Sequence, residues 1–403
     1  MAPVLGLVGK PNVGKSTFFT AATAAKAEIA NYPFTTIDPN RGMTYVQSPC
    51  PHTVLDVQCN PNNSRCEGGT RFVPLELVDV AGLVPDAHKG KGLGNKFLDD
   101  LRQASAFLHI VDASGGTDLE GNPVGAGKHD PVEDLDFLER ELDFWIAGIL
   151  MDKWDKVSRQ IQATGGKIIP ALVERLTGLG VREAHLAPAL IDAHVVKEKF
   201  LGWGEPEFLA IARAVRRRAK PMIVVGNKVD QATPEGLAAL AKACEARGLT
   251  FAPAASEAEL ALRNAAKAGV VGYHAGDPTF EVLTPDKLNT AQRNALEYIR
   301  THVMVPHGST GIAAAVRRAA YELLRLITVY PVEDEHKYTN KQGQVLPDAF
   351  LVPKGTTAKE MAFKVHTDLG NHFIRAIDAK RHRAMGADHE LEDGDVVRIV
   401  ADV

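Results

Sequence analysis

The sequence predicts an α/β fold with a mostly parallel sheet, helices on both of its faces, a helical insertion and a small C-terminal β-grasp domain. Three observations support this prediction. Short apolar runs recur through the first two thirds of the chain, and most of them lead into polar or glycine-rich motifs. A segment beginning near residue 130 has helical periodicity. Residues 326–403 alternate strand-like runs with turns.

The composition is that of a globular protein. The chain has 403 residues, of which 45% are hydrophobic and 24% charged, so we expect two or three domains. The net charge of −4 gives no global basic field, and we expect no DNA sequence readout. The chain has no run of 18 apolar residues, so we expect no membrane span and no membrane partner, and we expect no signal peptide before the first strand. The four cysteines fit a reducing, cytoplasmic location.

A phosphate-binding loop opens the chain. The apolar run at 3–8 predicts a buried strand, residues 17–22 can form a helix, and G-x-x-x-x-G-K-S lies between them. Backbone N–H groups in such a loop bind phosphate, helped by the dipole of the following helix. We expect Lys15 to reach the β- and γ-phosphates and Ser16 to ligate Mg²⁺. The candidate phosphate-binding residues are Gly9, Lys10, Pro11, Asn12, Val13, Gly14, Lys15, Ser16 and Thr17.

A second motif follows the strand-like residues 71–78, which lead into Asp79-Val80-Ala81-Gly82. Asp79 at a strand end can hold the hydration shell of Mg²⁺, and the Gly82 amide can sense the γ-phosphate. Four common residues carry little information alone. Their position after a strand and about 65 residues beyond a phosphate loop makes them a strong signal.

A third motif predicts the base. Asn227, Lys228 and Asp230 follow the apolar run 221–226. Asp230 can accept hydrogen bonds from N1–H and the 2-amino group of guanine. Adenine has neither donor, so the unpaired carboxylate would cost about 1–3 kcal/mol. The Lys228 stem can lie over the base; the alternative is an ordinary strand followed by a helix cap. Where the next strand ends, a backbone N–H is expected to meet the guanine carbonyl, at Ala255 and Ser256.

Three stretches together resemble a known family. They are G-K-P-N-V-G-K-S-T-F-F from residue 9, N-Y-P-F-T-T-I-D-P-N from residue 31, and D-V-A-G-L-V from residue 79 with G-K-G-L-G-N from residue 90. The chain resembles the Obg superfamily of translation-factor-class GTPases, and most of all its YchF-like branch of archaeal and fungal type. The resemblance implies a P-loop NTPase G domain. Some members of the branch have a degraded N-K-x-D motif and prefer ATP, so the intact motif here favours GTP.

The resemblance also implies the switch segments. Residues 32–36 would form switch I, with Phe34 and Thr35 at the nucleotide and Thr36 closing on Mg²⁺. Residues 79–95 would form switch II. Both assignments follow from the position of the residues in the family motifs.

The sequence has no glutamine at the position that usually orients the attacking water in GTP hydrolysis. Leu83 takes the position of the Gln that orients water in Ras-type sites, so we expect it to pack and the intrinsic rate to be slow. Asn12 can help to bind K⁺ beside the phosphates in place of an arginine finger, or it can only stabilise the loop turn. His88 can approach the water or be a solvated loop residue. The candidate catalytic residues are Lys15, Thr36, Gly82 and Asn12.

A helical insertion is expected at about 130–219. Asp130 and Pro131 predict an N-cap followed by proline at the first helical position. A helical hairpin or small bundle is predicted by the spacing of Leu135, Leu138, Leu142, Trp145 and Ile149. A further helix at 205–220 has a basic end, which either complements the helix dipole or faces RNA or a ribosome. Its basic residues are Arg213, Arg216, Arg217, Arg218 and Lys220.

A cysteine–histidine cluster lies between the first two motifs. Thiol and imidazole ligands suit zinc, although the spacing C-x-H-x₆-C-x₆-C is not a standard knuckle. The alternative is a β-hairpin extension that binds no metal. The residues are Cys50, His52, Cys59 and Cys66.

The last segment has a ubiquitin-like β-grasp pattern. Strands are expected at 327–332, 349–352, 373–377 and 396–400, and Thr357 to Glu360 reads as a capping box. The stretch L-P-D-A-F-L-V-P-K-G from residue 346 resembles the TGS domain, which implies a binding module for RNA or a ribosome. We therefore expect an OBG-type G domain at 1–325 and a TGS domain at 326–403.

The combined prediction is a Mg²⁺-dependent GTPase that binds GTP and GDP and acts as a switch with the ribosome or RNA. One alternative is an ATP-preferring hydrolase of the same fold. Another is a binding adaptor that the nucleotide merely stabilises, with incidental turnover.

Overall fold

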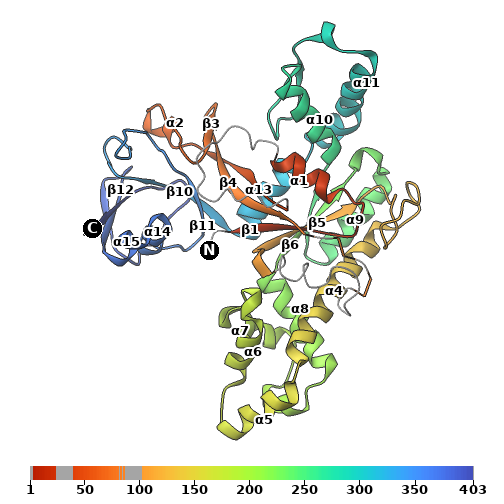
Figure 1. Cartoon of the computed structure of the whole chain (residues 1–403), viewed down its shortest axis with the longest axis vertical. Coiled ribbons are helices and arrows are strands. Elements are labelled where there is room, and N and C mark those ends of the chain that lie inside the picture. Colours follow the sequence, from red (N-terminus) through yellow and green to blue (C-terminus); the bar gives the residue numbers. More distant parts are fainter. Residues whose placement is uncertain (1–2, 24–39, 81, 84, 87–101, 403) are drawn as a thin grey trace. The chain divides into compact units, whose positions relative to one another are not determined.

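The computed structural model describes residues 3–23, 40–80, 82–83, 85–86 and 102–402. The chain divides into two compact units. The larger unit contains residues 4–21 and 78–315, and the smaller unit contains residues 1–3, 22–77 and 316–403. Figure 1 shows the helices and strands of both. None of the helices within the described residues is long and apolar enough to cross a membrane.

The larger unit is built on a parallel sheet with the strand order β1-β5-β6-β7. Each neighbouring pair in this order is parallel. All residues of β1, β5 and β6 are buried, which is why these strands are continuous apolar runs in the sequence. The strands are β1 Val4–Val8, β5 Ala106–Asp112, β6 Met222–Asn227 and β7 Thr250–Pro253, with a small hairpin of β8 Val271–Gly272 and β9 Glu281–Val282.

The carboxyl ends of parallel strands meet at one edge of a sheet, where open α/β folds place their ligands. Gly9, Asp112 and Asn227 lie at the ends of β1, β5 and β6. The helices of the larger unit outside the insertion are α1 Lys15–Thr23, α9 Pro234–Ala246, α10 Ser256–Lys267, α11 Thr290–Ile299, α12 Val305–His307 and α13 Ile312–Arg318 (Figure 1).

The predicted helical insertion contains five helices. They are α4 Pro131–Met151, α5 Trp154–Thr164, α6 Ile168–Leu176, α7 Glu183–Asp192 and α8 Glu205–Ala219 (Figure 1). As expected, the Asp130 side chain accepts a hydrogen bond from the Val132 N–H, and Pro131 occupies the first position of α4. The apolar seam of α4 serves two cores. Leu138 and Leu142 pack with β1 and β5, whereas Ile146 joins the core of the helical insertion.

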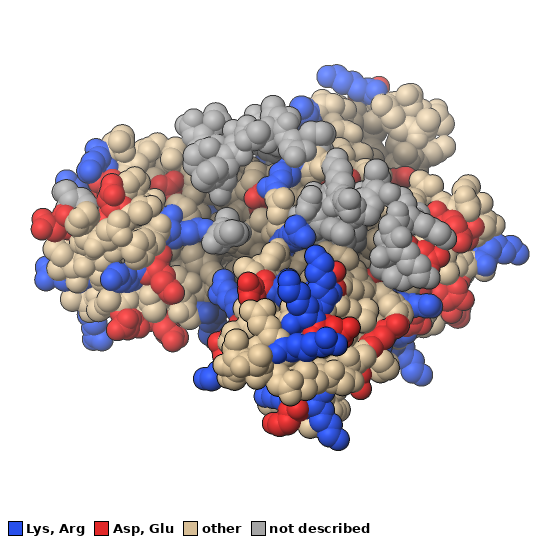
Figure 2. Space-filling view, turned by 60° about the horizontal axis from the view of Figure 1, so that its bottom comes forward, with Lys and Arg blue, Asp and Glu red and all other residues tan. Residues whose placement is uncertain are grey.

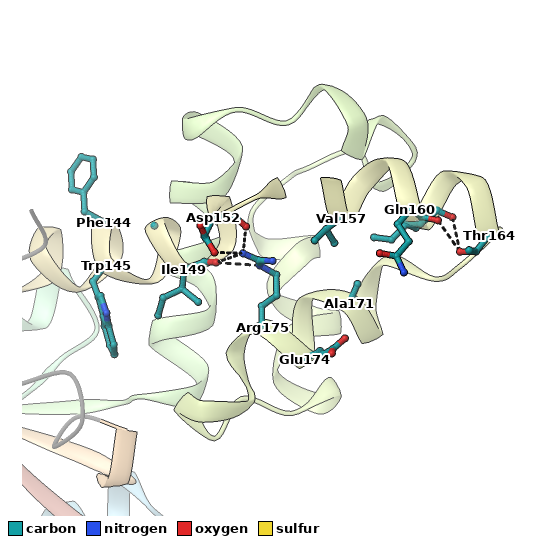
Figure 3. Close-up of a pocket in the computed structure, with 12 residues that line it drawn as sticks. Phe144, Trp145, Ile149, Asp152, Val157, Gln160, Thr164, Ala171, Glu174 and Arg175 are labelled. Carbon is teal, nitrogen blue, oxygen red and sulfur yellow. Dashed lines mark hydrogen bonds and ion pairs between the residues drawn. The ribbon is translucent and has the colours of Figure 1, made fainter. Parts of the chain in front are cut away.

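A groove of about 880 Å³ lies along α4, α5 and α6 (Figure 3). Arg175 of α6 points across it to the last turn of α4. Its guanidinium donates to the carbonyls of Ile149, at 2.7 Å, and Asp152. These bonds satisfy carbonyls that have no partner within the helix. Arg175 therefore fixes the corner between α4 and α5.

The basic end of α8 is largely paired within the protein. The buried Arg216 donates to Asp143 at 2.6 Å and to Glu139 at 3.1 Å. Lys220 is also buried and donates to the Ala104 carbonyl at 2.5 Å. Figure 2 shows Lys and Arg side chains on the visible face with Asp and Glu side chains between them. Arg216 and Lys220 are therefore not available to an RNA or ribosome patch on this helix.

The buried His109 of β5 makes the stability of the larger unit depend on pH. Burial, reinforced by the charges of Lys15 and Lys10, lowers the pKa of His109 to about 3. The same side chain titrates near 6.5 in the unfolded chain, so acidification below that pH protonates the unfolded state first. We expect the free energy of unfolding to fall by about 2 kcal/mol between about pH 6.5 and about pH 5 from this residue alone.

Urea unfolding of the parent and of His109→Leu at several pH values measures this contribution. The variant should have the shallower pH dependence, because the carboxylates that also titrate are common to both proteins. Equal slopes would contradict the assignment.

The smaller unit combines an N-terminal hairpin region with a five-stranded sheet. The first contains β2 Arg41–Pro49, α2 His52–Leu55, β3 Arg65–Glu67 and β4 Thr70–Asp79, which continues into the larger unit. The five-stranded sheet has the order β11-β10-β14-β12-β13. Its strands are β10 Leu326–Val332, β11 Phe350–Pro353, β12 Phe373–Asp378, β13 Arg383–Met385 and β14 Val396–Ala401.

Helix α14 Ala358–Val365 packs on this sheet, as a β-grasp fold requires, and the short helix α15 Thr367–Asn371 follows it. Thr357 and Glu360 form the predicted capping box of α14, and Met361 packs with sheet residues such as Val329 and Val397. The mixed sheet has β10 parallel to β14 at its centre and antiparallel neighbours on either side. The predicted α/β class with a C-terminal β-grasp fold is confirmed.

Candidate nucleotide-binding site

The loop between β1 and α1 is held tightly against its surroundings. Gly9 and Gly14 have φ of 148° and 95°, in the region that favours glycine. A Cβ at Gly9 would lie 2.4 Å from the Ile110 carbonyl oxygen, and one at Gly14 would lie 2.3 Å from the Asn227 side-chain nitrogen. Both glycines of the phosphate-loop motif are therefore required by close contacts with β5 and β6.

Lys15 begins α1, and its side chain folds back over the loop. The Lys15 ammonium donates to the Lys10 carbonyl at 2.7 Å. Burial lowers the pKa of Lys15 to about 8, against the opposing effect of the Asp79 charge. A Cβ on Gly82 would lie 3.2 Å from the same ammonium. The cation therefore lies between the phosphate loop and the Asp79–Gly82 motif, where a phosphate can reach it.

The arrangement of Ser16 and Asp79 fits a divalent cation. The Ser16 hydroxyl donates to Asp79 Oδ2 at 2.9 Å. The other carboxylate oxygen of Asp79 is buried and has no hydrogen-bond partner among the described residues. Burial raises the pKa of Asp79, with Ser16 and Lys15 opposing the shift. A hydroxyl and a carboxylate are ligands that Mg²⁺ prefers, and the ion would supply the missing partner.

The Asn227 and Lys228 side chains brace the phosphate loop. The Asn227 amide donates to the Val13 carbonyl at 2.9 Å, and its oxygen accepts from the Ser256 N–H and hydroxyl. Lys228, with a φ of 60°, donates to the Asn12 carbonyl at 3.1 Å and to Asp112 at 2.8 Å. These bonds join the first and third motifs into one site.

The segment assigned to the guanine carbonyl uses its N–H groups internally. Ser256 N–H donates to Asn227, and Ala255 N–H donates to the Thr310 carbonyl at 2.9 Å. Thr310 in turn donates from its hydroxyl to the fully buried Glu259. The next N–H, that of Glu257, lies in the first turn of α10, where helical N–H groups have no intrahelical acceptor.

Asp230 has an aromatic neighbour that sequence reasoning missed. The Tyr298 hydroxyl of α11 donates to the Asp230 carbonyl at 3.1 Å and lies 3.4 Å from its carboxylate. The Tyr298 ring stacks on His302 with the centroids 4.2 Å apart. No sequence motif predicts this contact, because the two residues are 68 positions apart in the chain. Tyr298 therefore borders the predicted base-recognition site.

The comparisons with known proteins agree with this geometry. Three family models match: a 50S ribosome-binding GTPase at residues 4–139, an Obg-like GTPase YGR210-like, G4 motif-containing domain at 225–334, and a TGS domain at 336–401. A GTP-binding protein of Methanocaldococcus jannaschii is 49% identical over 399 residues, which are 99% of both chains. The chain belongs to the YchF-like family of GTP-binding proteins.

More distant relatives and solved structures extend this result. The ribosome-binding ATPase YchF of Haemophilus ducreyi is 30% identical, with 97% of each chain covered. A GTP-binding protein from Pyrococcus horikoshii is 40% identical in sequence to this chain. Its crystal structure matches over 100% of both chains with a TM-score of 0.79. The YchF GTPase of Schizosaccharomyces pombe shares the fold, with a TM-score of 0.56 at 20% identity.

Two side chains of the phosphate loop in this YchF-like protein make contacts away from the predicted phosphate site. Lys10 is buried and donates to Asp134 at 2.7 Å and to the Thr117 carbonyl at 2.8 Å. Asn12, with a φ of 62°, donates to the Gly121 carbonyl at 2.9 Å. Any contact of Lys10 with phosphate would therefore come from its backbone.

The structure describes only some of the residues predicted to form the two switch segments. Phe34, Thr35, Thr36 and His88 lie outside the described residues, so their assignments stay predictions. Leu83 is 3% exposed and packs with Val4, Val8 and Phe107, as its apolar character predicted. The structure offers no route by which Leu83 could orient water.

Proposed function

We propose that this YchF-like protein is a Mg²⁺-dependent GTPase that acts as a nucleotide-dependent switch with the ribosome. The supporting observation is that three separate motifs converge on one site: Lys15 in the phosphate loop, the Ser16–Asp79 pair, and Asn227 bound to Val13. The names of the bacterial relatives, which are called ribosome-binding, supply the partner class.

Each group has a stated role in this proposal. Lys15 stabilises the charge that develops on the transferred phosphoryl group. Ser16 and Asp79 hold Mg²⁺ together with Thr36, and the bound ion neutralises phosphate charge. Asp230 accepts from guanine, and the Glu257 N–H is the proposed donor to the guanine carbonyl, because the N–H groups of Ala255 and Ser256 bond within the protein. Leu83 leaves the attacking water without a side-chain partner, so the intrinsic rate is slow.

Replacing Asp230 tests the choice of base. Asp230→Ala should weaken GTP binding about 10- to 100-fold, because two guanine donors lose their acceptor, and should change ATP binding little. Competition of GTP and ATP for a fluorescent nucleotide measures both affinities, and Glu245→Ala on the exposed face of α9 serves as the control. Tighter binding of ATP than of GTP by the parent protein would favour the ATP-preferring alternative, which the names of the bacterial relatives also suggest.

We propose that a K⁺ ion, bound with the help of Asn12, takes the role of an arginine finger. If Asn12 helps to bind K⁺, single-turnover GTP hydrolysis should be several-fold faster in K⁺ than in Na⁺ at equal ionic strength. The bond from Asn12 to Gly121 supports the other reading, in which the side chain only stabilises the loop turn. Equal rates in the two buffers would establish that reading.

Adding ribosomes distinguishes the switch hypothesis from the adaptor hypothesis. A switch enzyme should hydrolyse GTP much faster when ribosomes are present, and its GTP and GDP forms should bind them differently. An adaptor should show no acceleration and equal binding in both nucleotide states. Single-turnover rates and co-sedimentation with ribosomes measure the two properties.

A further inference from the structure

The four residues of the cysteine–histidine cluster converge in the smaller unit. One ligand atom from each of Cys50, His52, Cys59 and Cys66 lies within 4.8 Å of all the others. His52 Nδ1 is 3.3 Å from the Cys59 sulfur and 3.4 Å from the Cys66 sulfur. The cysteines form no disulfide. Four ligands at tetrahedral angles around one zinc ion lie about 3.5–3.8 Å apart, close to these distances.

Hydrogen bonds from thiols to His52 do not by themselves explain this convergence. An imidazole nitrogen that is not protonated has one lone pair, so Nδ1 of His52 can accept from one thiol at most. Both Cys59 and Cys66 nevertheless lie within 3.4 Å of it. A cation shared by three thiolates and one imidazole satisfies all four groups at once.

Few apolar side chains are buried in the surrounding segment. In the fully described stretch 51–69, the buried apolar side chains are Pro51 and Cys59, and Val54 is 80% exposed. In a segment with so small a core, metal binding by its side chains would contribute directly to the folding free energy. The backbone brings the ligands together locally, because the Cys50 N–H donates to the Gly69 carbonyl at 2.8 Å, next to β3, which carries Cys66.

We propose that Cys50, His52, Cys59 and Cys66 bind one structural zinc ion. Three thiolates and an imidazole form a closed tetrahedral set with no open position, which is typical of structural zinc and not of a catalytic metal. Soft thiolate ligands in this geometry select zinc over Mg²⁺ or Ca²⁺. The site is separate from the Ser16–Asp79 pair, which offers only oxygen ligands.

The zinc ion holds the segment that contacts the β-grasp domain. Backbone N–H groups of Asn60 and Asn62 donate to the carbonyls of Val345 and Pro347, at 2.8 and 2.6 Å. Asn63 pairs with Ala349 through both its amide nitrogen, at 3.1 Å, and its oxygen, at 2.9 Å. These residues lie between Cys59 and Cys66 in the chain. The metal therefore fixes the strip that pairs with residues 345–349.

Metal analysis of the full-length protein tests the proposal. Protein purified without a metal-affinity step and passed through EDTA should retain about one zinc per chain by mass spectrometry. Cobalt-loaded protein should show the intense visible bands of tetrahedral thiolate coordination. Cys59→Ser, Cys66→Ser and His52→Ala should lose the metal, whereas His52→Cys should keep it. Cys244→Ala is the matched control, because Cys244 is buried in α9, outside the cluster.

A second measurement keeps the test valid if a variant folds poorly. Removing zinc from the parent protein with a strong chelator should speed amide exchange at Asn60, Asn62 and Asn63, whose N–H groups bond to the β-grasp domain, and leave the phosphate loop unchanged. Protein that contains no zinc after refolding with zinc, and whose cluster thiols all alkylate in the native state, would overturn the proposal. A disulfide within the cluster, or iron in place of zinc, would overturn it as well.

Discussion

Lys15→Met is expected to slow single-turnover GTP hydrolysis about 100- to 1,000-fold, the usual effect of removing one preorganised charge stabiliser. The Lys15 ammonium is held by the Lys10 carbonyl and lies beside Gly82. Its position therefore needs little reorganisation during the reaction. Methionine fills similar space without the charge, so the loss measures electrostatic stabilisation and not packing.

The matched control is Lys242→Met, a change of the same type at an exposed position of α9. Its hydrolysis rate should equal that of the parent protein. Rates are measured at saturating nucleotide, so that weaker binding by Lys15→Met does not count as slower chemistry. A rate for Lys15→Met within a few-fold of the parent would show that Lys15 does not stabilise the transition state.

Asp134→Ala is expected to cost about 3–5 kcal/mol of folding free energy, because it leaves a buried ammonium without its counter-charge. The side chains of Lys10 and Asp134 are 1% and 2% exposed, and their charged atoms are 2.7 Å apart. His129 also contacts Asp134, at 2.8 Å. Burial raises the pKa of Asp134, and the hydrogen bond from Lys10 offsets part of that shift. Urea unfolding monitored by circular dichroism measures the loss.

Two further variants distinguish this explanation from general damage to α4. Glu133→Ala removes an acid from the same helical turn, but the Glu133 side chain is 60% exposed, so it should cost less than about 1 kcal/mol. The double variant Lys10→Met with Asp134→Leu should recover most of the stability, because no unpaired charge remains. A double variant as unstable as Asp134→Ala would contradict the ion-pair explanation.

Local patterns predicted the elements that carry the chemistry. Runs at 3–8 and 221–226 correspond to β1 and β6, since strands buried on both faces must be apolar throughout, and the mixed run at 71–78 corresponds to the partly buried β4. The N-cap at Asp130 and the capping box at Thr357 were also predicted from the sequence, because a helix cap depends on residues only a few positions apart. The candidate site was predictable to the same extent, since each motif is contiguous in the chain.

Contacts between distant residues were not predictable in this way. The phosphate-loop motif predicts Lys10 at the phosphates, but its side chain pairs with Asp134, 124 residues away. Asp134 itself was visible only as an acid in the first turn of a helix. Tyr298 beside Asp230 and Thr310 beneath Ala255 likewise carry no sequence signal. The cysteine–histidine cluster was visible as a composition, and only its convergence supports a metal.

The sequence by itself therefore determined the family, the motifs from which phosphate, Mg²⁺ and guanine binding are predicted, and the positions of several strands and helices. Those features depend on residue type at short spacing, which a single chain displays directly. The tertiary structure decided which charged groups pair inside the protein, as Arg216 does with Asp143, and which buried atoms have no partner among the described residues, as with Asp79 Oδ1. The physical reason is that burial and pairing belong to the packed chain, because only folding brings distant side chains together and removes their water.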